Sequence, residues 1–355
     1  MTQIVFLGAG ASAAEGAPVQ SVLIPMLAER SNESRLMRRD GFSPYVMEPN
    51  DIPDYLQNVF GYDGTAARAQ KPAPTFEEVI GVLDAAIDLG LPFGSPLYSN
   101  GNRLSGNLSI QIIRQELIRQ LADSLSIIQP RGVHAQLCRS LAAASMVENI
   151  VFVTTNYDSY IDNALTECCP GMQIDYGCQL DDRPIDRTKP TVALLKLHGS
   201  TNWLHCPNCG ATYSALDRST RACSTCVAHT WCEPLIVPPT YFKHLHYDAI
   251  AETWSSFRRA LRAATGITFC GYSFPDADFH VKAELKRTEL YSRRPLFGDF
   301  KLHVRICNNY PGKSGEASAR EREAYERFFA GPVEYTGLSF EDFVAQASNI
   351  LTASV

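Results

Sequence analysis

Four cysteines form the most specific chemical pattern in this sequence. They are arranged as two CxxC pairs separated by thirteen residues: Cys206, Cys209, Cys223 and Cys226. Each pair places two thiolates on one side of a tight turn, and two such pairs complete a tetrahedral zinc site. Four protein ligands leave no open coordination position, so we expect a structural metal. His229 and Cys232 lie close enough in the sequence to serve as substitute ligands.

The N-terminal segment ends in a glycine-rich loop. IVFLGAGAS is a short apolar run followed by Gly8 and Gly10, which is typical of a buried parallel strand that leads into a helix. Such glycines let the backbone approach a pyrophosphate, and the start of the helix offers N–H groups and a positive dipole end. A tight turn that binds nothing is the alternative. A dehydrogenase would need a third glycine and an acidic residue ~20 residues further on, and Glu29 lies in a helical context instead.

Polar clusters also follow two later strand-like runs. Residues 154–158 (TTNYD) come after IVFV, and residues 196–200 (KLHGS) come after VALL. Ligands of doubly wound sheets bind at the carboxyl ends of the strands. There Asn156 could hold a ribose hydroxyl or a water, and His198 could act as a general base near neutral pH. Helix capping by a residue such as Asp158, and a purely structural histidine, are the alternatives.

Two further motifs follow predicted strands near the C-terminus. Gly271-Tyr272-Ser273 and Asn308-Asn309 could line the far end of a nucleotide cleft, whereas His280 suits a helix surface as well as a site. Several polar clusters each follow the end of a different predicted strand. This pattern favours the interpretation that they form one shared binding site over the interpretation that each is a separate structural turn.

The elements that must position these residues are indicated by the apolar spacing. Apolar residues recur at intervals of three and four from Leu108 to Ile128, and helical patterns also cover 76–89 and 134–144. We therefore expect a mainly helical insertion over residues 31–146. Beyond it, strand-like and helical runs alternate. Strand-like runs are expected at 150–156, 192–198, 267–273 and 300–308, and helices at 249–264, 278–291 and 320–329. This alternation predicts an α/β fold with a doubly wound parallel sheet.

Composition excludes several classes of protein. The 355-residue chain has a formal net charge of −6 and lacks the basic surface of a nucleic-acid binder, so direct nucleic-acid binding is not expected. No positively charged leader or apolar run of membrane length is visible, so we expect a cytoplasmic protein without a membrane anchor. Eleven cysteines in that setting indicate metal ligands and buried thiols and argue against a disulfide framework.

Taken together and in order, these motifs resemble those of the sirtuin superfamily. GAGASAAEGAP is similar to the family's phosphate loop, TTNYD to its TQNID motif, and KLHGS to the strand end with the catalytic histidine. The CxxC pairs resemble its zinc module, and CGYS and ICNN its ribose- and adenine-side motifs. The motifs span residues 4–310, although residues 31–146 have no obvious counterpart.

The details resemble one branch, the bacterial sirtuin-like proteins of antiphage defence, which degrade NAD. TTNYD, KLHGS and GYSFPDAD carry this resemblance. Protein deacylases have Phe-Arg after the Gly-x-Pro of the first loop, but here Gly16-Ala17-Pro18 is followed by Val19-Gln20-Ser21. The resemblance thus implies an NAD glycohydrolase that yields nicotinamide and ADP-ribose as the NAD-depleting effector of a defence system. The alternatives are an NAD-dependent deacylase or ADP-ribosyltransferase, and a non-catalytic sensor of NAD or ADP-ribose.

The resemblance also implies roles, domains and partners. His198 would be the general base, Asn156 would position the ribose or the attacking water, and Asp158 would orient them. The residues implied in NAD binding are Gly8, Ala9, Gly10, Ser12, Thr155, Gly271, Ser273 and Asn308. The implied domains are a Rossmann-like NAD-binding domain (1–30, 147–204 and 234–355), the helical insertion (31–146) and a zinc-ribbon module (205–233). Expected partners are further copies of the chain and an activating protein such as an ATPase or nuclease.

Overall fold

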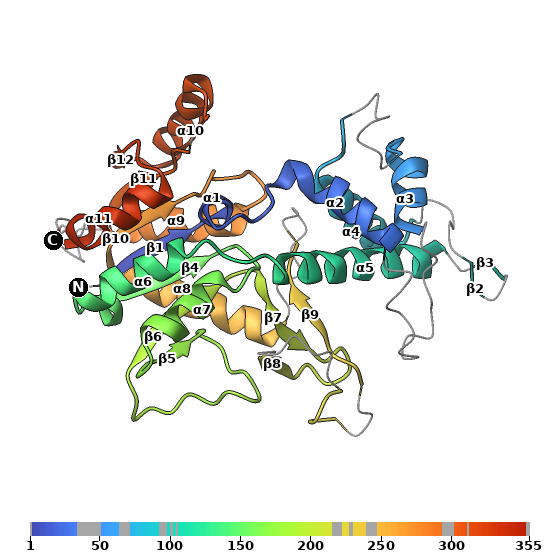
Figure 1. The fold of residues 1–355 in the computed structure, drawn as a ribbon, viewed down its shortest axis with the longest axis horizontal. Coiled ribbons are helices and arrows are strands. Elements are labelled where there is room, and N and C mark those ends of the chain that lie inside the picture. Colours follow the sequence, from blue (N-terminus) through green and yellow to red (C-terminus); the bar gives the residue numbers. More distant parts are fainter. Residues whose placement is uncertain are drawn as a thin grey trace. The chain divides into compact units, whose positions relative to one another are not determined.

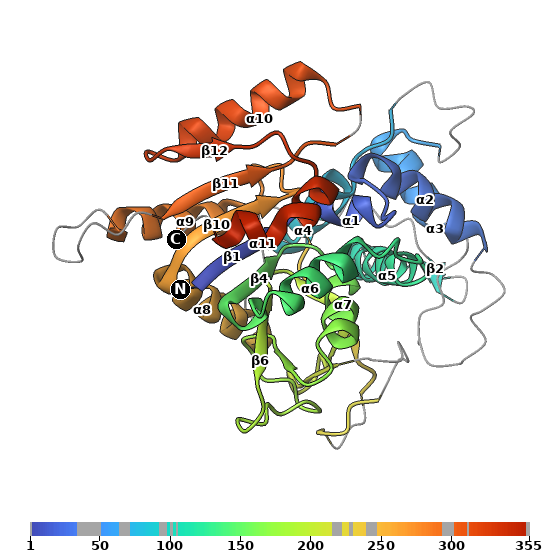
Figure 2. The same cartoon turned by 60° about the vertical axis from the view of Figure 1, so that its left-hand side comes forward.

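The computed structural model describes most of the chain and is shown from two directions in Figures 1 and 2. The described residues are 2–33, 51–63, 72–91, 98–99, 102–103, 106–214, 222–226, 230–238, 247–292, 302–310 and 312–352. They fall into two compact units. Unit 1 comprises Met1–Ala17, Ile128–Val237 and His244–Val355, and unit 2 comprises Pro18–Ile127 and Pro238–Lys243.

Unit 1 is built on a seven-stranded sheet in which every pairing is parallel. Its spatial order is β12 (Val333–Tyr335), β11 (His303–Cys307), β10 (Ala264–Cys270), β1 (Thr2–Leu7), β4 (Ile150–Thr154), β6 (Thr191–Lys196) and β5 (Gln173–Asp175). The central strands are almost continuously apolar and buried, as strands covered on both faces must be. The predicted α/β fold with a doubly wound parallel sheet is confirmed.

The order of the strands places a topological switch point beside β1. From β1 the chain passes to β4, β5 and β6 on one side, then returns to β10 on the other side and continues to β11 and β12. The connections that follow β1 and β10 lead away in opposite directions from this point, beside which open α/β sheets bind their ligands. Gly8 directly follows β1, Gly10 lies at the beginning of the next helix, and Gly271 directly follows β10.

Helices cover both faces of this sheet. The helices of unit 1 are α1 (Ala9–Ala14), α6 (Val133–Ala143), α7 (Tyr160–Cys168), α8 (Asp248–Ala263), α9 (Phe279–Ser292), α10 (Gly315–Phe328) and α11 (Phe340–Thr352), with a 3₁₀ turn at Val147–Asn149. Helix α6 packs against α7 and α11, whereas α8 contacts α9 and the strands β1 and β6 (Figure 2). Crossovers in opposite directions along the sheet require helices on opposite faces.

The connections of a second sheet in unit 1 contain the predicted metal ligands. This sheet is antiparallel, with the order β8 (Thr212–Ser214), β7 (Gly199–His205) and β9 (Glu233–Ile236). These three short strands had no clear signal in the sequence, because each is only three to seven residues long. Strand β7 begins directly after His198 and ends directly before Cys206.

Unit 2 is helical in most of its described residues. It contains α2 (Gln20–Glu33), α3 (Asp51–Tyr55), a π-helical turn (Leu56–Phe60), α4 (Phe76–Leu89), a hairpin of β2 (Tyr98–Ser99) and β3 (Asn102–Arg103), and α5 (Gly106–Ser126). The predicted helix over 76–89 is confirmed, and the helices expected at 108–128 and 134–144 are found as α5 and α6. Helix α4 begins with a capping box, in which Thr75 and Glu78 satisfy each other's backbone N–H groups. The division of the chain into three domains stays a prediction.

No helix among the described residues is both long enough and apolar enough to cross a membrane.

A buried carboxylate joins the end of α1 to the beginning of α6. Glu15 is 1% exposed and accepts hydrogen bonds from the backbone N–H of Gly132 (2.7 Å) and of His134 (2.6 Å). Its Oε1 also lies 2.9 Å from His134 Nδ1. Burial raises the pKa of Glu15, but the bonds and charge from His134 and the bond from Gly132 outweigh it and lower the pKa to about 2.

We therefore expect Glu15→Gln to lower the free energy of unfolding at pH 7 by about 1–3 kcal/mol, because a buried charge-assisted network is lost. The folded-state pKa lies below the ordinary value of 4.5, so this contribution is present above pH 4.5 and disappears as the pH falls toward 2. Urea denaturation between pH 2 and 7 measures both effects. Glu326→Gln, at a half-exposed pair with Arg322, is the control; equal behaviour of the two variants would contradict the prediction.

Candidate functional site

Four strands of unit 1 end at the same level of the sheet. Leu7 of β1 is in register with Cys270 of β10 and with Thr154 of β4, and Thr154 is in register with Lys196 of β6. The loops that follow these strands therefore meet at one edge. The residues predicted from TTNYD, KLHGS, GAGAS and CGYS all lie in or beside these loops.

The glycines of the first loop pack against the backbone of the loop after β10. Gly10 N–H donates to Gly271 O (2.7 Å) and Gly8 N–H donates to Cys270 O (2.9 Å). A Cβ on Gly10 would lie 2.7 Å from Gly271 Cα, and one on Gly8 would lie 2.5 Å from Tyr272 Cα. Gly271 itself has a φ of +63°. The fold thus requires these glycines for its own packing, and their contact with a pyrophosphate stays a prediction.

A hydrogen-bonded chain links the first loop to the TTNYD loop. Asn156 Nδ2 donates to Gly8 O (2.8 Å) and to Ser12 Oγ (2.7 Å), and Ser12 Oγ donates to Asp158 Oδ2 (2.5 Å). Asp158 Oδ1 also accepts the N–H of Tyr160 at the beginning of α7 (3.1 Å). Both amide protons of Asn156 are engaged in this way, so its Oδ1 is the atom suited to accept a hydrogen bond from a ligand.

A buried lysine donates hydrogen bonds to the TTNYD loop and to the helix that follows it. Lys196 is fully buried, and its Nζ donates to Asp158 O (2.6 Å) and to Asp162 Oδ2 (2.8 Å). Asp162 Oδ1 accepts from Tyr176 OH (2.7 Å) and Asn202 Nδ2 (3.2 Å). Burial and the neighbouring Asp162 raise the pKa of Tyr176 well above its usual range. Sequence reasoning missed Asp162, because a single acidic residue within a helix carries no distinguishing signal.

His198 lies in the connection between the parallel and the antiparallel sheet. It is 2% exposed, its backbone oxygen accepts from Val237 N–H (2.8 Å), and its ring centroid is 6.5 Å from that of Tyr157. The following Gly199 has a φ of +79°, and a Cβ there would lie 2.0 Å from Leu235 O. The HisGly pair is thus the corner at which the chain changes sheets, and this corner fixes the histidine.

The structure adds a carboxylate to the histidine that sequence reasoning did not select. Asp278 Oδ1 lies 3.7 Å from His198 Nε2, and its Oδ2 accepts from Tyr272 OH (2.7 Å). Burial and the charge of Asp278 raise the pKa of Tyr272 well above its usual range. Within the same motif, His280 is instead half-buried, with its ring 6.2 Å from that of Trp254. Asp278 lies in the GYSFPDAD motif, which supported the family resemblance, but no pattern in the sequence assigned this residue a role in the site.

The residues expected near the adenosine lie in adjacent loops. Ser273 is exposed, whereas Asn308 is buried, and its Nδ2 donates to Tyr272 O (3.1 Å) and to Glu321 Oε2 (2.5 Å). Lys313 Nζ also bonds to Glu321 Oε1 (3.0 Å). The side-chain donors of Asn308 are therefore used to join the loop after β10 to α10. Its contact with a nucleotide stays a prediction, as do those of Ala9 (exposed) and Thr155 (half-buried).

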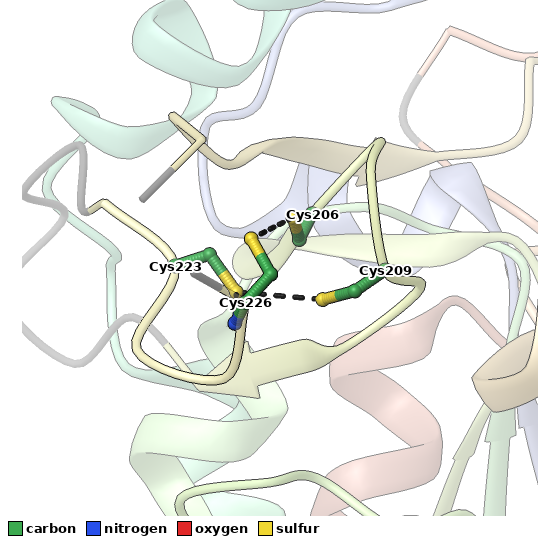
Figure 3. A group of neighbouring side chains, drawn as sticks. All are labelled: Cys206, Cys209, Cys223 and Cys226. Carbon is green, nitrogen blue, oxygen red and sulfur yellow. Dashed lines mark hydrogen bonds between the residues drawn. The ribbon is translucent and has the colours of Figure 1, made fainter. Parts of the chain in front are cut away.

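The four predicted cysteine ligands converge beside the antiparallel sheet (Figure 3). All four Sγ atoms lie within 4.8 Å of one another. Cys206 and Cys226 are 3.8 Å apart and Cys209 and Cys223 are 3.5 Å apart, close to the ~3.8 Å edge of a tetrahedron with ~2.3 Å metal–sulfur bonds. This group could hold a metal ion. Cys232 is buried outside it, and His229 lies outside the described residues.

One segment of the chain, which contains much of this site, is similar to a known protein family. Residues 150–288 match the family model of the SIR2-like domain, which is less than half of the chain. The matched segment contains Asn156, His198, the four cysteines and Asp278. The segment similar to this domain thus includes Asp158 as well, and with it all three residues predicted to be catalytic. No curated protein is similar to the chain in sequence.

Solved structures with low sequence identity are also similar to the chain. The structure titled "Sir2-p53 peptide-NAD+" is 13% identical, with a TM-score of 0.42, over 99% of this chain and 94% of that chain. A SIR2 structure in complex with an inhibitor, 2'-O-acetyl-ADP-ribose and a deacetylated p53 peptide is 12% identical, with a TM-score of 0.40, over 99% and 94% of the two chains.

The buried lysine generates a prediction. Lys196→Met leaves Asp162 as an uncompensated buried charge, so we expect the free energy of unfolding to fall by about 3–5 kcal/mol. Lys196→Met combined with Asp162→Asn should regain part of that loss, because no unpaired charge remains. The control is Lys189→Met, at an exposed pair with Asp186 (3.9 Å), which should change stability by less than about 1 kcal/mol. Chemical denaturation distinguishes these outcomes; a loss no larger than that of the control would contradict the prediction.

Proposed function

We propose that the chain is an NAD glycohydrolase that cleaves NAD to nicotinamide and ADP-ribose. The observation that carries this proposal is the placement of Asn156 and His198 after neighbouring parallel strands, β4 and β6. Asn156 donates hydrogen bonds to Gly8, directly after β1, and to Ser12 of α1, so it adjoins the proposed phosphate-binding segment. The SIR2-like domain match over residues 150–288 includes both side chains.

The proposed reaction needs a base and an orienting group more than an acid. The N-glycosidic bond breaks, nicotinamide leaves as a neutral molecule with the bonding electron pair, and the ribose becomes oxocarbenium-like. A water oxygen then bonds to the anomeric carbon and its proton passes to His198. Asn156 Oδ1 would accept a hydrogen bond from the ribose or the water, and Asp158 would hold this arrangement through Ser12.

The NAD-binding residues are proposed from the loops at the switch point. The first loop (Gly8, Ala9, Gly10 and Ser12) would hold the pyrophosphate, and Thr155 would line the ribose. Gly271, Ser273 and Asn308 would face the adenosine side. Of these residues, Gly8 and Gly10 also pack against the loop after β10, and Gly271 packs against Gly10. A bulky substitution at a glycine would therefore test folding together with binding.

Incubation of the purified chain with NAD, with and without an acetylated peptide, tests this function. We expect nicotinamide and ADP-ribose in both reactions. We expect His198→Gln and Asn156→Ala to lower kcat by about 10²–10⁴-fold, since base and positioning group are lost. The matched controls are His303→Gln and Asn349→Ala, which change exposed or half-buried positions away from the site.

The other products would identify the alternatives. Acetylated ADP-ribose formed only with the peptide would make the chain a deacylase, and transfer of ADP-ribose to protein would make it a transferase. NAD binding measured by calorimetry without any product would indicate a sensor. Full activity of both His198→Gln and Asn156→Ala would refute the site assignment.

We propose that the cysteine group binds one structural zinc. Four thiolates are the ligands of closed structural zinc sites, and the sulfur positions fit a tetrahedron. The zinc would tie the hairpin between β7 and β8 to the segment that precedes β9.

Elemental analysis should find one zinc per chain. Cys209→Ser should lower both the zinc content and the thermal stability, because binding energy of a structural metal is folding energy. Cys168→Ser, at a half-buried cysteine outside the group, serves as the control. A folded, active preparation without zinc would overturn this assignment.

In the cell we propose that the chain is the cytoplasmic NAD-depleting effector of a bacterial antiphage defence system. Unrestrained NAD hydrolysis would kill the host, so we propose control by homo-oligomer formation or by an activating ATPase or nuclease partner. The resemblance of TTNYD, KLHGS and GYSFPDAD to that branch supports this role.

A further inference from the structure

We propose that Asp278 is a positioning residue that holds the His198 imidazole in its reactive orientation and stabilises its protonated form. This inference rests on the proposed function, because it assigns a partner to the base of that reaction. It adds a residue that acts through His198 and does not itself touch the substrate.

The side chains of His198 and Asp278 are both buried and face each other. His198 Nε2 lies 3.7 Å from Asp278 Oδ1, and the residues are 2% and 3% exposed. This distance is within ion-pair range but longer than a hydrogen bond of 2.7–3.2 Å. Contacts between catalytic groups are often long without substrate and shorten when it binds. The pair is therefore placed to form its bond in the complex.

Hydrogen bonds fix both the carboxylate and the backbone of Asp278. Asp278 Oδ2 accepts from Tyr272 OH (2.7 Å), Asp278 N–H donates to Pro275 O (3.2 Å), and Asp278 O accepts from Lys282 N–H (3.0 Å). Asp278 thus stands immediately before α9, a fourteen-residue helix. The positive end of that helix dipole favours an ionised carboxylate.

The segment from Gly271 to Asp278 is itself firmly anchored. Tyr272 O accepts from Tyr325 OH (2.7 Å) and from Asn308 Nδ2 (3.1 Å). Phe274 has a φ of 58°, which costs a non-glycine residue about 1–2 kcal/mol. Its ring is buried against Tyr325 and Phe328, with centroids 4.6 and 4.9 Å away, and this packing offsets the cost. A segment held in this way can keep Asp278 at a fixed distance from His198.

A carboxylate beside His198 would favour the transfer of a proton from water to the imidazole. A buried imidazole that accepts a proton becomes a charged group in a medium that solvates it poorly, and an adjacent negative charge offsets that penalty. Asp278, in the segment before α9, and Tyr157, in the loop after β4, both face the ring from other elements. Tyr272 contacts the carboxylate of Asp278.

The test compares Asp278→Asn with Asp276→Asn in the full chain. Asp276 lies two residues earlier, is paired with Lys282, and has a side chain that is 83% exposed. Asp278→Asn keeps the shape of the side chain and its acceptor for Tyr272 but removes the charge. We expect its kcat to fall at least about tenfold, with the Kd for NAD changed less than about twofold. Asp276→Asn should match the wild type in both.

A double mutant separates action through His198 from a structural effect. If Asp278 acts through the histidine, Asp278→Asn should cause no further loss in the His198→Gln background. Equal additional losses in both backgrounds would overturn the inference, as would a wild-type kcat for folded Asp278→Asn while the wild-type chain cleaves NAD.

NMR titration of the His198 ring provides a readout that does not need activity. Asp278→Asn should lower the pKa of His198 by about one unit, because an adjacent negative charge is removed, while Asp276→Asn should leave it unchanged. If the wild-type chain produces no nicotinamide, the proposed function fails, but the titration still decides whether the two groups interact. An unchanged pKa of His198 in Asp278→Asn would refute the pairing.

Discussion

The close approach of two backbone segments at the switch point is the constraint on which the site depends. Gly8 and Gly10 leave no side chain between the loop after β1 and the loop after β10, and Gly271 adopts a left-handed conformation that completes the contact. Any side chain there would separate β1 from β10 at their carboxyl ends. The loop after β4 would then lose its partner as well, because Asn156 donates to Gly8 O.

From this contact, hydrogen bonds extend across the edge of the sheet. Ser12 connects Asn156 to Asp158, and Lys196 connects Asp158 to Asp162 beneath the loop. Each buried polar group in this series forms a hydrogen bond with the next, because an unpaired polar group is costly in a low-dielectric interior. Side chains at the ends of β1, β4 and β6 are thereby held at fixed distances, although they are far apart in the sequence. Preorganisation of this kind is what positions reacting groups without further cost when a substrate binds.

The main features of the fold could be predicted from the sequence, but the partners of the site residues could not. Short apolar runs that end in polar motifs identified the strands whose carboxyl ends carry Asn156 and His198. The CxxC spacing also identified four thiols that the structure brings together. Contacts such as Asp278 with His198 and Lys196 with Asp162 depend on which loops face one another, and no local pattern encodes that. The glycines were interpreted as room for a ligand; the structure shows that they also let another part of the backbone approach, and their contact with a ligand stays a prediction.

The antiparallel strand β7 connects His198 to the cysteine group. It spans Gly199–His205, so His198 stands at its beginning and Cys206 at its end (Figure 1). The strand is not evenly extended, because its register with β9 shifts between Gly199 and Leu204. A metal ion bound by the four cysteines would act on His198 through β7, because none of the four belongs to the loops that carry Asn156 and His198. Loss of such an ion to a chelator, or oxidation of the thiols, would then alter the order of β7 and of the histidine at its start, and not the chemical groups of the site.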